Sequence, residues 1–313
     1  MYFLGVDGGG TKTQILIADE KANILGMSTV GPTYMHSLTE DEIYGALDDG
    51  IFKALVDSGL KRPKITKSCF GIAGLDSPYD FEVLSKSVKR INSIKLDSSP
   101  ILLNDSVCAL RRGTDKAFGM VIVAGTGSNC YGKNRKGDEA FVGGLGHVLS
   151  DEGGSYYIGQ RVLHAAARSY DGRGPKTKLE DLVYETFGVA NMRELILKVH
   201  EKTFGKSQIG GLSFVCEKAS ADGDSLAHEI LVDAAKELVL MVVTVADKIS
   251  LRYDAFDLVC VGGTFKKENG PARTYFDKKI KEDIPRAKII YPSTEPAIGA
   301  VLIAIDRYKS SLS

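Results

Sequence analysis

The chain has 313 residues, with 40 basic and 40 acidic side chains, so its formal net charge is zero. This balance provides no overall field that would recruit nucleic acid or an acidic membrane surface. The longest strongly apolar run, Leu238–Ala246, has nine residues, far fewer than the roughly 20 that a membrane-spanning helix needs. Glycine is unusually frequent, with 34 residues, and its clusters carry most of the functional information.

The five cysteines are scattered along the chain and form no CxxC or Cys/His ligand spacing. We therefore expect reduced, buried thiols and neither a zinc nor an iron–sulfur site. The first residues, Met1–Asp7, lack a basic segment, so we expect no signal peptide and a cytoplasmic protein.

Three strands are predicted in the first thirty residues, at Tyr2–Asp7, Thr13–Ala18 and Ile24–Thr29. They are short and apolar or alternating, and turn residues separate them. A capping box beginning at Thr39 then predicts a helix that continues to Gly59.

The next segments alternate between strands and helices. Ser68–Leu75 is typical of a buried strand, and Pro78 opens a helix at its first position. Ile101–Asn104 is a short predicted strand, and Val107–Arg112 is predicted to be helical.

A second unit begins near Phe118 and repeats the layout of the first. Strands are predicted at Gly119–Ala124, Asn129–Lys133 and Glu139–Val142, with a Gly/Thr turn after the first strand and a polar turn after the second. We interpret this as an internal duplication of a β-hairpin unit. The alternative is that two glycine-rich hairpins arose independently.

The rest of the chain is mostly helical from Gly153 to about Ser250, and Ala227–Ser250 has the clearest apolar face. Strands follow at Leu258–Val261 and Lys288–Tyr291, and Thr294 to Pro296 are predicted to start the last helix.

Three glycine-rich turns are candidate nucleotide-binding loops. In the first, Gly9, Gly10, Thr11, Lys12 and Thr13 offer backbone N–H groups, hydroxyls and one positive charge to a phosphate. It is not a Walker A loop, because Thr11 separates the last glycine from Lys12 and a strand follows. A tight hairpin turn is the alternative.

The second turn, Thr126, Gly127 and Ser128, offers the same groups. The third, Gly262 and Gly263, favours close backbone approach to a flat ligand such as adenine. Two phosphate-binding turns on paired hairpins could grip one polyphosphate from opposite sides of a cleft.

Three carboxylates follow or end predicted strands or lie in a glycine-rich loop. Asp7 is suited to holding Mg²⁺ directly or through water. Asp105 is suited to accepting a proton from a substrate hydroxyl. Asp151 lies in the glycine-rich segment Gly143–Gly154. Asp105 and Asp151 both precede helices, so helix capping is the alternative for each. His147 is interpreted as a structural group and not as a base.

Five motifs together carry a resemblance to a known family. They occur in the order Gly5–Thr13, Asn104–Asp105, Ala124–Asn129, Gly143–Gly154 and Val261–Thr264. In this order they resemble the BadF/BadG-type ATPase and N-acetylglucosamine kinase family, which belongs to the actin/Hsp70/sugar-kinase superfamily. The resemblance covers almost the whole chain, and it is greatest to amino-sugar kinases that act on N-acetylglucosamine and N-acetylmuramic acid.

The resemblance implies an α/β fold of two ribonuclease-H-like, actin-like ATPase domains around a central nucleotide cleft. The first domain would comprise residues 1–117 and 295–313, and the second would comprise residues 118–294. It implies ATP and Mg²⁺ as cofactors and Asp105 as the base at the sugar 6-hydroxyl. The implied ATP-binding residues are Gly9, Gly10, Thr11, Lys12, Thr13, Thr126, Gly127, Ser128, Ala219, Ser220, Gly262 and Gly263. The implied substrate-binding residues are Thr33, Tyr34, Gly74, Asp76, Asp105, Ser128, Asn129, Gly144, Leu145, Gly146 and Asp151.

The sequence departs from the animal members of the family at two places. Those enzymes carry an Asn near Tyr34 and a Trp at Leu145. The smaller Leu145 leaves room for a lactyl ether, which favours N-acetylmuramic acid as an additional substrate. We expect a small-molecule sugar as the substrate, a homodimer, and no nucleic-acid or membrane partner.

Other functions remain open on the sequence. The chain could be a glucosamine kinase, or an ATPase that activates a partner dehydratase or reductase. Such activators carry an iron–sulfur cluster, for which the cysteine pattern offers no evident site. A nucleotide-gated binding module would leave the segment Gly143–Gly154 unexplained, and a ROK-type sugar kinase would be expected to carry a Cys-rich zinc motif.

Overall fold

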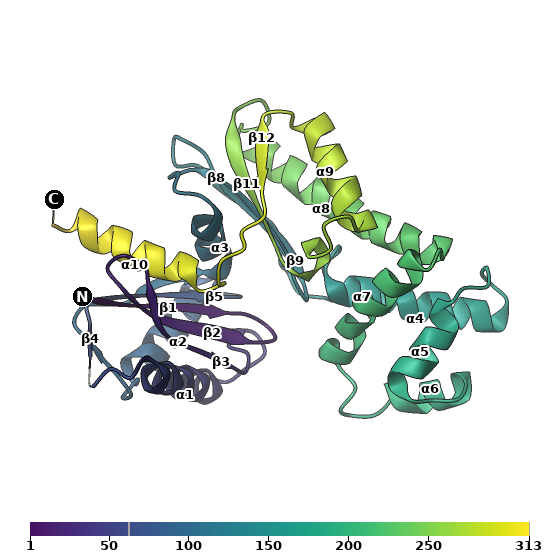
Figure 1. Cartoon of the computed structure of the whole chain (residues 1–313), viewed down its shortest axis with the longest axis horizontal. Helices are drawn as coiled ribbons and strands as arrows, with labels where there is room; N and C mark the ends of the chain where they lie inside the picture. The colour runs from purple at the N-terminus through teal and green to yellow at the C-terminus, as the bar shows by residue number, and fades with distance from the viewer. Residues whose placement is uncertain (62, 313) are drawn as a thin grey trace. The chain divides into compact units, whose positions relative to one another are not determined.

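The computed structural model describes every residue except 62 and 313 (Figure 1). The chain divides into two compact units, which are described separately. The first comprises Met1–Val121 and Ile290–Ser313, and the second comprises Ile122–Ile289.

The first unit is built on a five-stranded sheet with the order β3-β2-β1-β5-β7. β1 pairs antiparallel with β2 and parallel with β5, and β5 is parallel to β7. The strands are β1 (Tyr2–Gly8), β2 (Thr13–Asp19), β3 (Ile24–Val30), β5 (Lys67–Ile72) and β7 (Ile101–Asn104). A separate pair of short parallel strands consists of β4 (Lys64–Ile65) and β6 (Lys95–Leu96).

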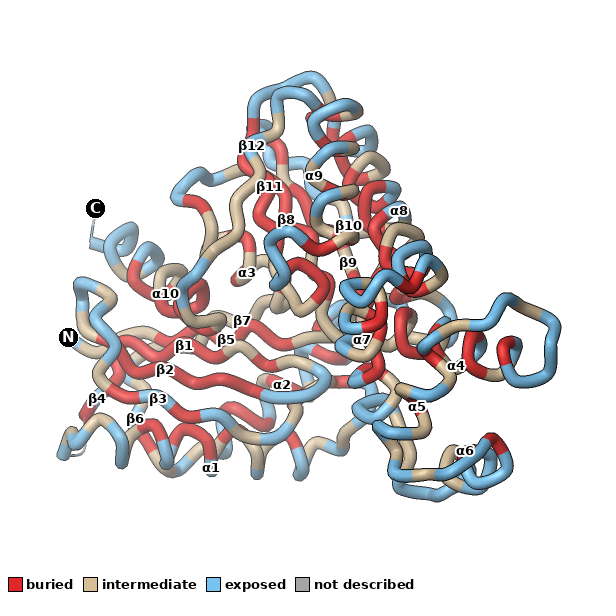
Figure 2. The backbone as a smooth tube through the Cα atoms, turned by 45° about the vertical axis from the view of Figure 1, so that its right-hand side comes forward, coloured by how far each residue is buried: buried red, intermediate tan, exposed pale blue. Residues whose placement is uncertain are grey.

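Helices cover both faces of this sheet, because successive side chains of a strand point to opposite faces. Leu4 and Val6 face the core that α1 (Glu40–Ser58) and α2 (Pro78–Lys89) complete. Phe3 faces the core that α3 (Asp105–Gly113) and α10 (Ile298–Ser310) complete. Because helices pack on both faces, β1 and β2 are almost entirely buried (Figure 2).

The helix boundaries in the first unit follow local capping chemistry. Thr39 and Glu42 form the predicted capping box of α1, which ends at Gly59 in the left-handed conformation. Ser77 and Asp80 form a second capping box, and Pro78 is the first residue of α2.

The last helix begins four residues later than the sequence predicts, at Ile298 instead of Thr294. Gln14 on β2 explains the difference, because its side chain bonds both to the Glu295 carboxylate and to the backbone N–H of Ala297. These two bonds hold the segment before Ile298 on β2, outside the helix.

The second unit contains another five-stranded sheet, with the order β10-β9-β8-β11-β12. When the strands of each sheet are numbered along the chain, the two orders are the same, as an internal duplication predicts. The strands are β8 (Gly119–Ala124), β9 (Ser128–Lys133), β10 (Glu139–Gly143), β11 (Phe256–Val261) and β12 (Ala287–Ile290).

The helices of the second unit occupy the region that the sequence predicts to be helical. α4 packs on α7, and α8 packs on β9, β10 and α9. Their bounds are α4 (Ser155–Asp171), α5 (Leu179–Phe187), α6 (Met192–Val199), α7 (Lys206–Ala221), α8 (Ser225–Lys248) and α9 (Pro271–Asp283), with a short 3₁₀ turn at Gly263–Phe265. Among the described residues, none of these or the other helices combines the length and apolar composition of a bilayer-spanning segment.

Candidate active site

The first glycine-rich turn connects β1 to β2 and is closed by backbone hydrogen bonds. The Gly9 N–H donates to the Lys12 carbonyl over 3.0 Å, and the Thr33 N–H donates to the Gly9 carbonyl over 3.2 Å. The Ala73 N–H donates to the Gly8 carbonyl over 2.7 Å. Segments following β3 and β5 therefore hold this turn in place.

Two threonines predicted to bind ligands lie beneath the turn. Thr13 and Thr33 are fully buried, and their hydroxyl oxygens are 2.9 Å apart. They brace the turn from inside, whereas Gly10, Thr11 and Lys12 lie at its exposed tip.

Asp105 is available for chemistry because its neighbour caps the helix. The Asn104 side chain accepts the N–H of Ser106, and Asp105 is the first helical residue of α3. The alternative that Asp105 is the N-cap is therefore wrong. Burial, reinforced by the nearby negative charge of Asp7, raises the pKa of Asp105 to about 7.

Asp7, near the end of β1, is a second carboxylate in the same cluster. Burial raises the pKa of Asp7 to about 6, although Arg112 and Lys12 pull it down. No group of three or more His, Cys, Asp or Glu side chains suited to a metal ion occurs among the described residues. A cation at Asp7 would therefore need most of its ligands from substrate or water.

Several predicted sugar contacts lie together beside Asp105. The Asn104 side-chain amide donates to Asp76 over 2.7 Å. Gly74 adopts a left-handed φ of 76°, and a Cβ there would lie 2.7 Å from the Tyr34 ring. Tyr34 in turn makes an edge contact with His36, with the ring centroids 5.4 Å apart.

Arg112 belongs to this region, and the sequence analysis missed it. Its guanidinium donates to the carbonyls of Pro292 and Thr294, and its charge acts on both Asp7 and Glu295. The available signal was its spacing: Arg112 lies seven residues after Asp105, which is two helical turns and the same face of α3.

In the second unit, the turn between β8 and β9 is held against the start of α4. The N–H of Ser155 donates to the Gly125 carbonyl over 2.8 Å, and the N–H of Tyr156 donates to the Thr126 carbonyl over 3.1 Å. The carbonyls of this turn are thus directed toward the helix N-terminus, which stabilises them.

Asp151 lies directly against this turn and is buried. A Cβ on Gly127 would lie 2.5 Å from the Asp151 carboxylate, so only glycine leaves room for it. Asp151 adopts a left-handed φ of 73°, which is uncommon for a residue with a side chain. Its carboxylate accepts the Ser128 N–H over 3.4 Å, and burial raises its pKa.

The N-cap of α4 is Gly154, not Asp151. The capping alternative is therefore wrong for this carboxylate as well. Its strained backbone and its packing on Gly127 are typical of a side chain that is held in place for a ligand.

The third glycine-rich turn meets the second. Gly262 has a φ of 117°, and a Cβ there would overlap the carbonyl of Ala124. The Thr264 hydroxyl donates to the Gly153 carbonyl over 3.1 Å. The second unit therefore brings together the Thr126–Ser128 turn, the Asp151 loop and the Gly262–Gly263 turn.

The remaining predicted residues of the second unit flank this cluster. The Gly144 N–H donates to the Ser128 carbonyl over 2.8 Å, and a Cβ at Gly144 would touch Asn129. Leu145 is 69% exposed, and Gly146 follows it in the loop that leads to Asp151. Ala219 and Ser220 lie in the last turn of α7, where Ala219 is fully buried and the Ser220 carbonyl accepts the Gly223 N–H.

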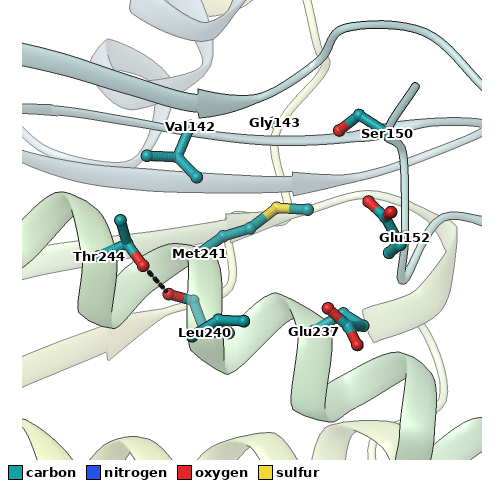
Figure 3. Close-up of a pocket in the computed structure, with 8 residues that line it drawn as sticks. All are labelled: Val142, Gly143, Ser150, Glu152, Glu237, Leu240, Met241 and Thr244. Atoms are coloured by element: carbon teal, nitrogen blue, oxygen red, sulfur yellow. Dashed lines mark hydrogen bonds between the residues drawn. The ribbon is translucent and has the colours of Figure 1, made fainter.

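A cavity of about 270 Å³ lies beside the Asp151 loop, between β10 and α8. Glu152 and Glu237 project their carboxylates into it (Figure 3). Burial and then the charge of Glu152 raise the pKa of Glu237. The complete lining is Val142, Gly143, Ser150, Glu152, Glu237, Leu240, Met241 and Thr244.

Comparisons with known proteins agree with this architecture. The chain is 32% identical over 303 residues to a Clostridium acetobutylicum protein named N-acetylmuramic acid/N-acetylglucosamine kinase, covering 97% of this chain and 98% of the relative. It is also 32% identical to the N-acetyl-D-glucosamine kinase of Dictyostelium discoideum, covering 98% of each chain.

A solved structure from Chromobacterium violaceum, described as a candidate N-acetylglucosamine kinase, superposes with a TM-score of 0.78 at 19% identity and covers 97% of this chain and 98% of its own. This likeness confirms the predicted α/β fold of the actin-like ATPase type. The model of the BadF/BadG/BcrA/BcrD ATPase family matches residues 4–304. The match extends over nearly the whole length, and the chain therefore belongs to the BadF/BadG/BcrA/BcrD ATPase family.

Proposed function

We propose that the protein is an ATP-dependent amino-sugar kinase. It would transfer the γ-phosphoryl group of ATP to the 6-hydroxyl of N-acetylglucosamine, N-acetylmuramic acid or both. The observation that carries the proposal is Asp105, whose carboxyl has a pKa of about 7 and is released from capping by Asn104. The names of the two relatives, each 32% identical, supply the substrate class.

In this reaction, the oxygen of the sugar hydroxyl forms a bond to the γ-phosphorus, and Asp105 accepts the proton of that hydroxyl. The bond from that phosphorus to the bridging oxygen breaks, and ADP leaves. Phosphoryl transfer depends chiefly on positioning and on charge stabilisation. A carboxyl with a pKa near the working pH is well matched to accepting this proton.

The two glycine-rich turns would hold the phosphates of one ATP. Gly9–Lys12 of the first unit and Thr126–Ser128 of the second both present backbone N–H groups and hydroxyls, and Thr13 braces the first turn from below. Gly262 and Gly263 would lie against the adenosine, and Ala219 and Ser220 would lie near it. We propose that the two units are the two domains of the enzyme.

The sugar would lie between two sets of side chains. Thr33, Tyr34, Gly74 and Asp76 come from the first unit. Asn129, the Gly144–Gly146 loop and Asp151 come from the second unit, where Ser128 holds the loop through its bond to the Glu152 carbonyl.

The residues near Asp7 fit a divalent cation that accompanies ATP. Burial raises the pKa of the Asp7 carboxyl to about 6, and a bound cation would lower it further than Arg112 and Lys12 already do. Bound Mg²⁺ would neutralise charge on the phosphates during transfer. We further propose that the enzyme acts in the cytoplasm as a homodimer.

An ATP-consumption assay over glucose, glucosamine, N-acetylglucosamine and N-acetylmuramic acid tests the function. We expect turnover with one or both N-acetylated sugars and little turnover with glucose. Tight ATP binding without turnover of any sugar would refute the kinase assignment and favour an ATPase that activates a partner enzyme. An absorbing iron–sulfur chromophore in the purified protein would support the same conclusion.

A further inference from the structure

Lys206, the first residue of α7, lies in a position that neither the motifs nor the proposed mechanism explains. The first turn of α7 packs tightly on the first turn of α4. A Cβ on Gly159 would overlap the carbonyl of Ile209, and a Cβ on Gly210 would lie 3.0 Å from the Ser155 hydroxyl. The start of α7 is therefore fixed on the helix turn that directly follows the Asp151 loop.

His147 also lies near the start of α4. It lies in the loop between Leu145 and Asp151, and its ring makes an edge contact with Tyr156, the second residue of α4, at 4.9 Å between centroids. Lys206 and His147 therefore both lie near the N-terminal turn of α4, which directly follows the Asp151 loop.

The three groups act on one another electrostatically. Burial raises the pKa of Asp151, and Lys206 opposes that rise. Burial and Lys206 together lower the pKa of His147 from its ordinary value of 6.5, so this imidazole is mainly uncharged at neutral pH. Lys206 is therefore the lysine whose charge acts on Asp151 in this cluster.

The Lys206 ammonium is exposed, and it forms no hydrogen bond or ion pair with any residue that the structure describes. The other residues near the loop are poorly suited to an anion, because Asp151, Glu152 and Glu237 are all acidic. A substrate that brings its own carboxylate to this loop would meet repulsion unless Lys206 offsets it.

We propose that Lys206 determines specificity for amino sugars that carry a carboxylate, by pairing with that carboxylate beside the Asp151 loop. This inference rests on the proposed function. N-acetylglucosamine is neutral, whereas N-acetylmuramic acid is the same sugar with a carboxylate on a lactyl ether. Lys206 therefore contributes to the binding of the second sugar and little to that of the first.

The test measures kcat/KM for N-acetylglucosamine, N-acetylmuramic acid and the uncharged methyl ester of N-acetylmuramic acid. Lys206→Met should lower kcat/KM for the acid by about three- to fivefold, the upper range for the loss of an exposed charge pair. The values for N-acetylglucosamine and for the ester should change by less than about twofold. Lys206→Arg keeps the positive charge and should retain most of the kcat/KM for N-acetylmuramic acid. Lys206→Glu should lower that kcat/KM more than Lys206→Met does.

Lys248→Met is the matched control, because it removes the same charge from an exposed position at the last residue of α8. It should leave all three values unchanged. If Lys206→Met lowered kcat/KM equally for all three substrates, the proposal would be overturned. Lys206 would then act by keeping Asp151 ionised and not by pairing with the substrate. Wild-type turnover of N-acetylglucosamine without turnover of the acid would also overturn it while leaving the kinase function standing. Turnover of neither sugar would refute the kinase function itself.

Discussion

At the start of α3, two adjacent side chains perform separate tasks. Asn104 caps the helix and also donates to Asp76. Asp105 retains its carboxyl for chemistry, with a pKa that burial and Asp7 raise. Because Asn104 is the cap, Asp105 is left free of capping and can take the role of the base that we propose for it.

Replacing Asp105 with Asn tests its role as the base. Asn keeps the shape of the side chain but cannot accept the proton, so we expect kcat to fall by at least about 10²-fold. ATP binding, measured by calorimetry, should be retained. Asp97→Asn removes a carboxylate from an exposed position of the same unit and serves as the control. Near-normal turnover of Asp105→Asn would remove Asp105 from this role.

The raised pKa values of Asp105 and Asp7 predict the pH dependence of the enzyme. A base must be unprotonated, and a carboxyl with a pKa of about 7 is mostly protonated below that pH. We expect kcat/KM to fall by about tenfold per pH unit below pH 7. The decline should become steeper below about pH 6, where Asp7 also takes up a proton. Initial rates between pH 5.5 and 8.5 check this, and a flat profile would show that Asp105 titrates much lower.

At this scale, sequence pattern marks Asp7, Asp105 and Asp151 as candidate site residues but does not indicate which side chains surround them. Asp7 and Asp105 are recognisable because each lies where an apolar strand ends, and the segment around Asp151 is marked by glycines. Arg112 and Lys206 each come from helices with no motif around them. Their importance depends on packing between distant segments, which local pattern does not encode.

Among the elements, the hairpins and the capped helices were the most predictable. β1, β2 and the ends of α1 follow from alternation, a capping box and a left-handed glycine, all of which are local signals. The start of α10 was mispredicted because its boundary is set by Gln14, a residue 281 positions away from Glu295. Local helix signals cannot include such a contact.

Arg112→Met tests the anchoring of the segment that leads into α10. The change leaves the carbonyls of Pro292 and Thr294 without this donor, which costs about 1–3 kcal/mol of unfolding free energy. We expect the melting temperature to fall by about 3–8 °C. The neighbouring Arg111→Met should have a smaller effect, because its partners Asp115 and Asp306 are 95% and 50% exposed. If the melting temperature fell equally in both variants, the hydrogen bonds of Arg112 to Pro292 and Thr294 would contribute no more than the exposed ion pairs of Arg111.

For the whole molecule, the shared strand order of the two sheets agrees with the repeat seen in the sequence. The repeat was detectable because both hairpins carry a glycine-rich turn between their first two strands. The long helical region of the second unit has no counterpart among the described residues of the first. The periodicity of apolar residues predicted helices in this region, but it could not predict that α4 packs on α7.

The proposal that both turns hold one ATP predicts the effect of changes in either unit. Lys12→Met removes a charge from the first turn, and Thr126→Ala removes a hydroxyl from the second. Each should raise the Kd for ATP by about three- to tenfold, in the range of one charge-assisted or neutral hydrogen bond. Lys61→Met, an exposed charge in the first unit, is the control. If only one of the two turns affected ATP affinity, the proposal of joint binding would fail.

The return of the chain to its first sheet has a consequence during synthesis. β1 leaves the ribosome well before α10, which covers one of its faces. Val301 of α10 lies so close to Gly5 of β1 that any larger residue at position 5 would collide with it. Until the last helix emerges, a growing polypeptide would display that face uncovered, with Phe3 and Leu16 in contact with water. Newly made molecules would then be most prone to aggregate, and most in need of a chaperone, in the interval before α10 emerges.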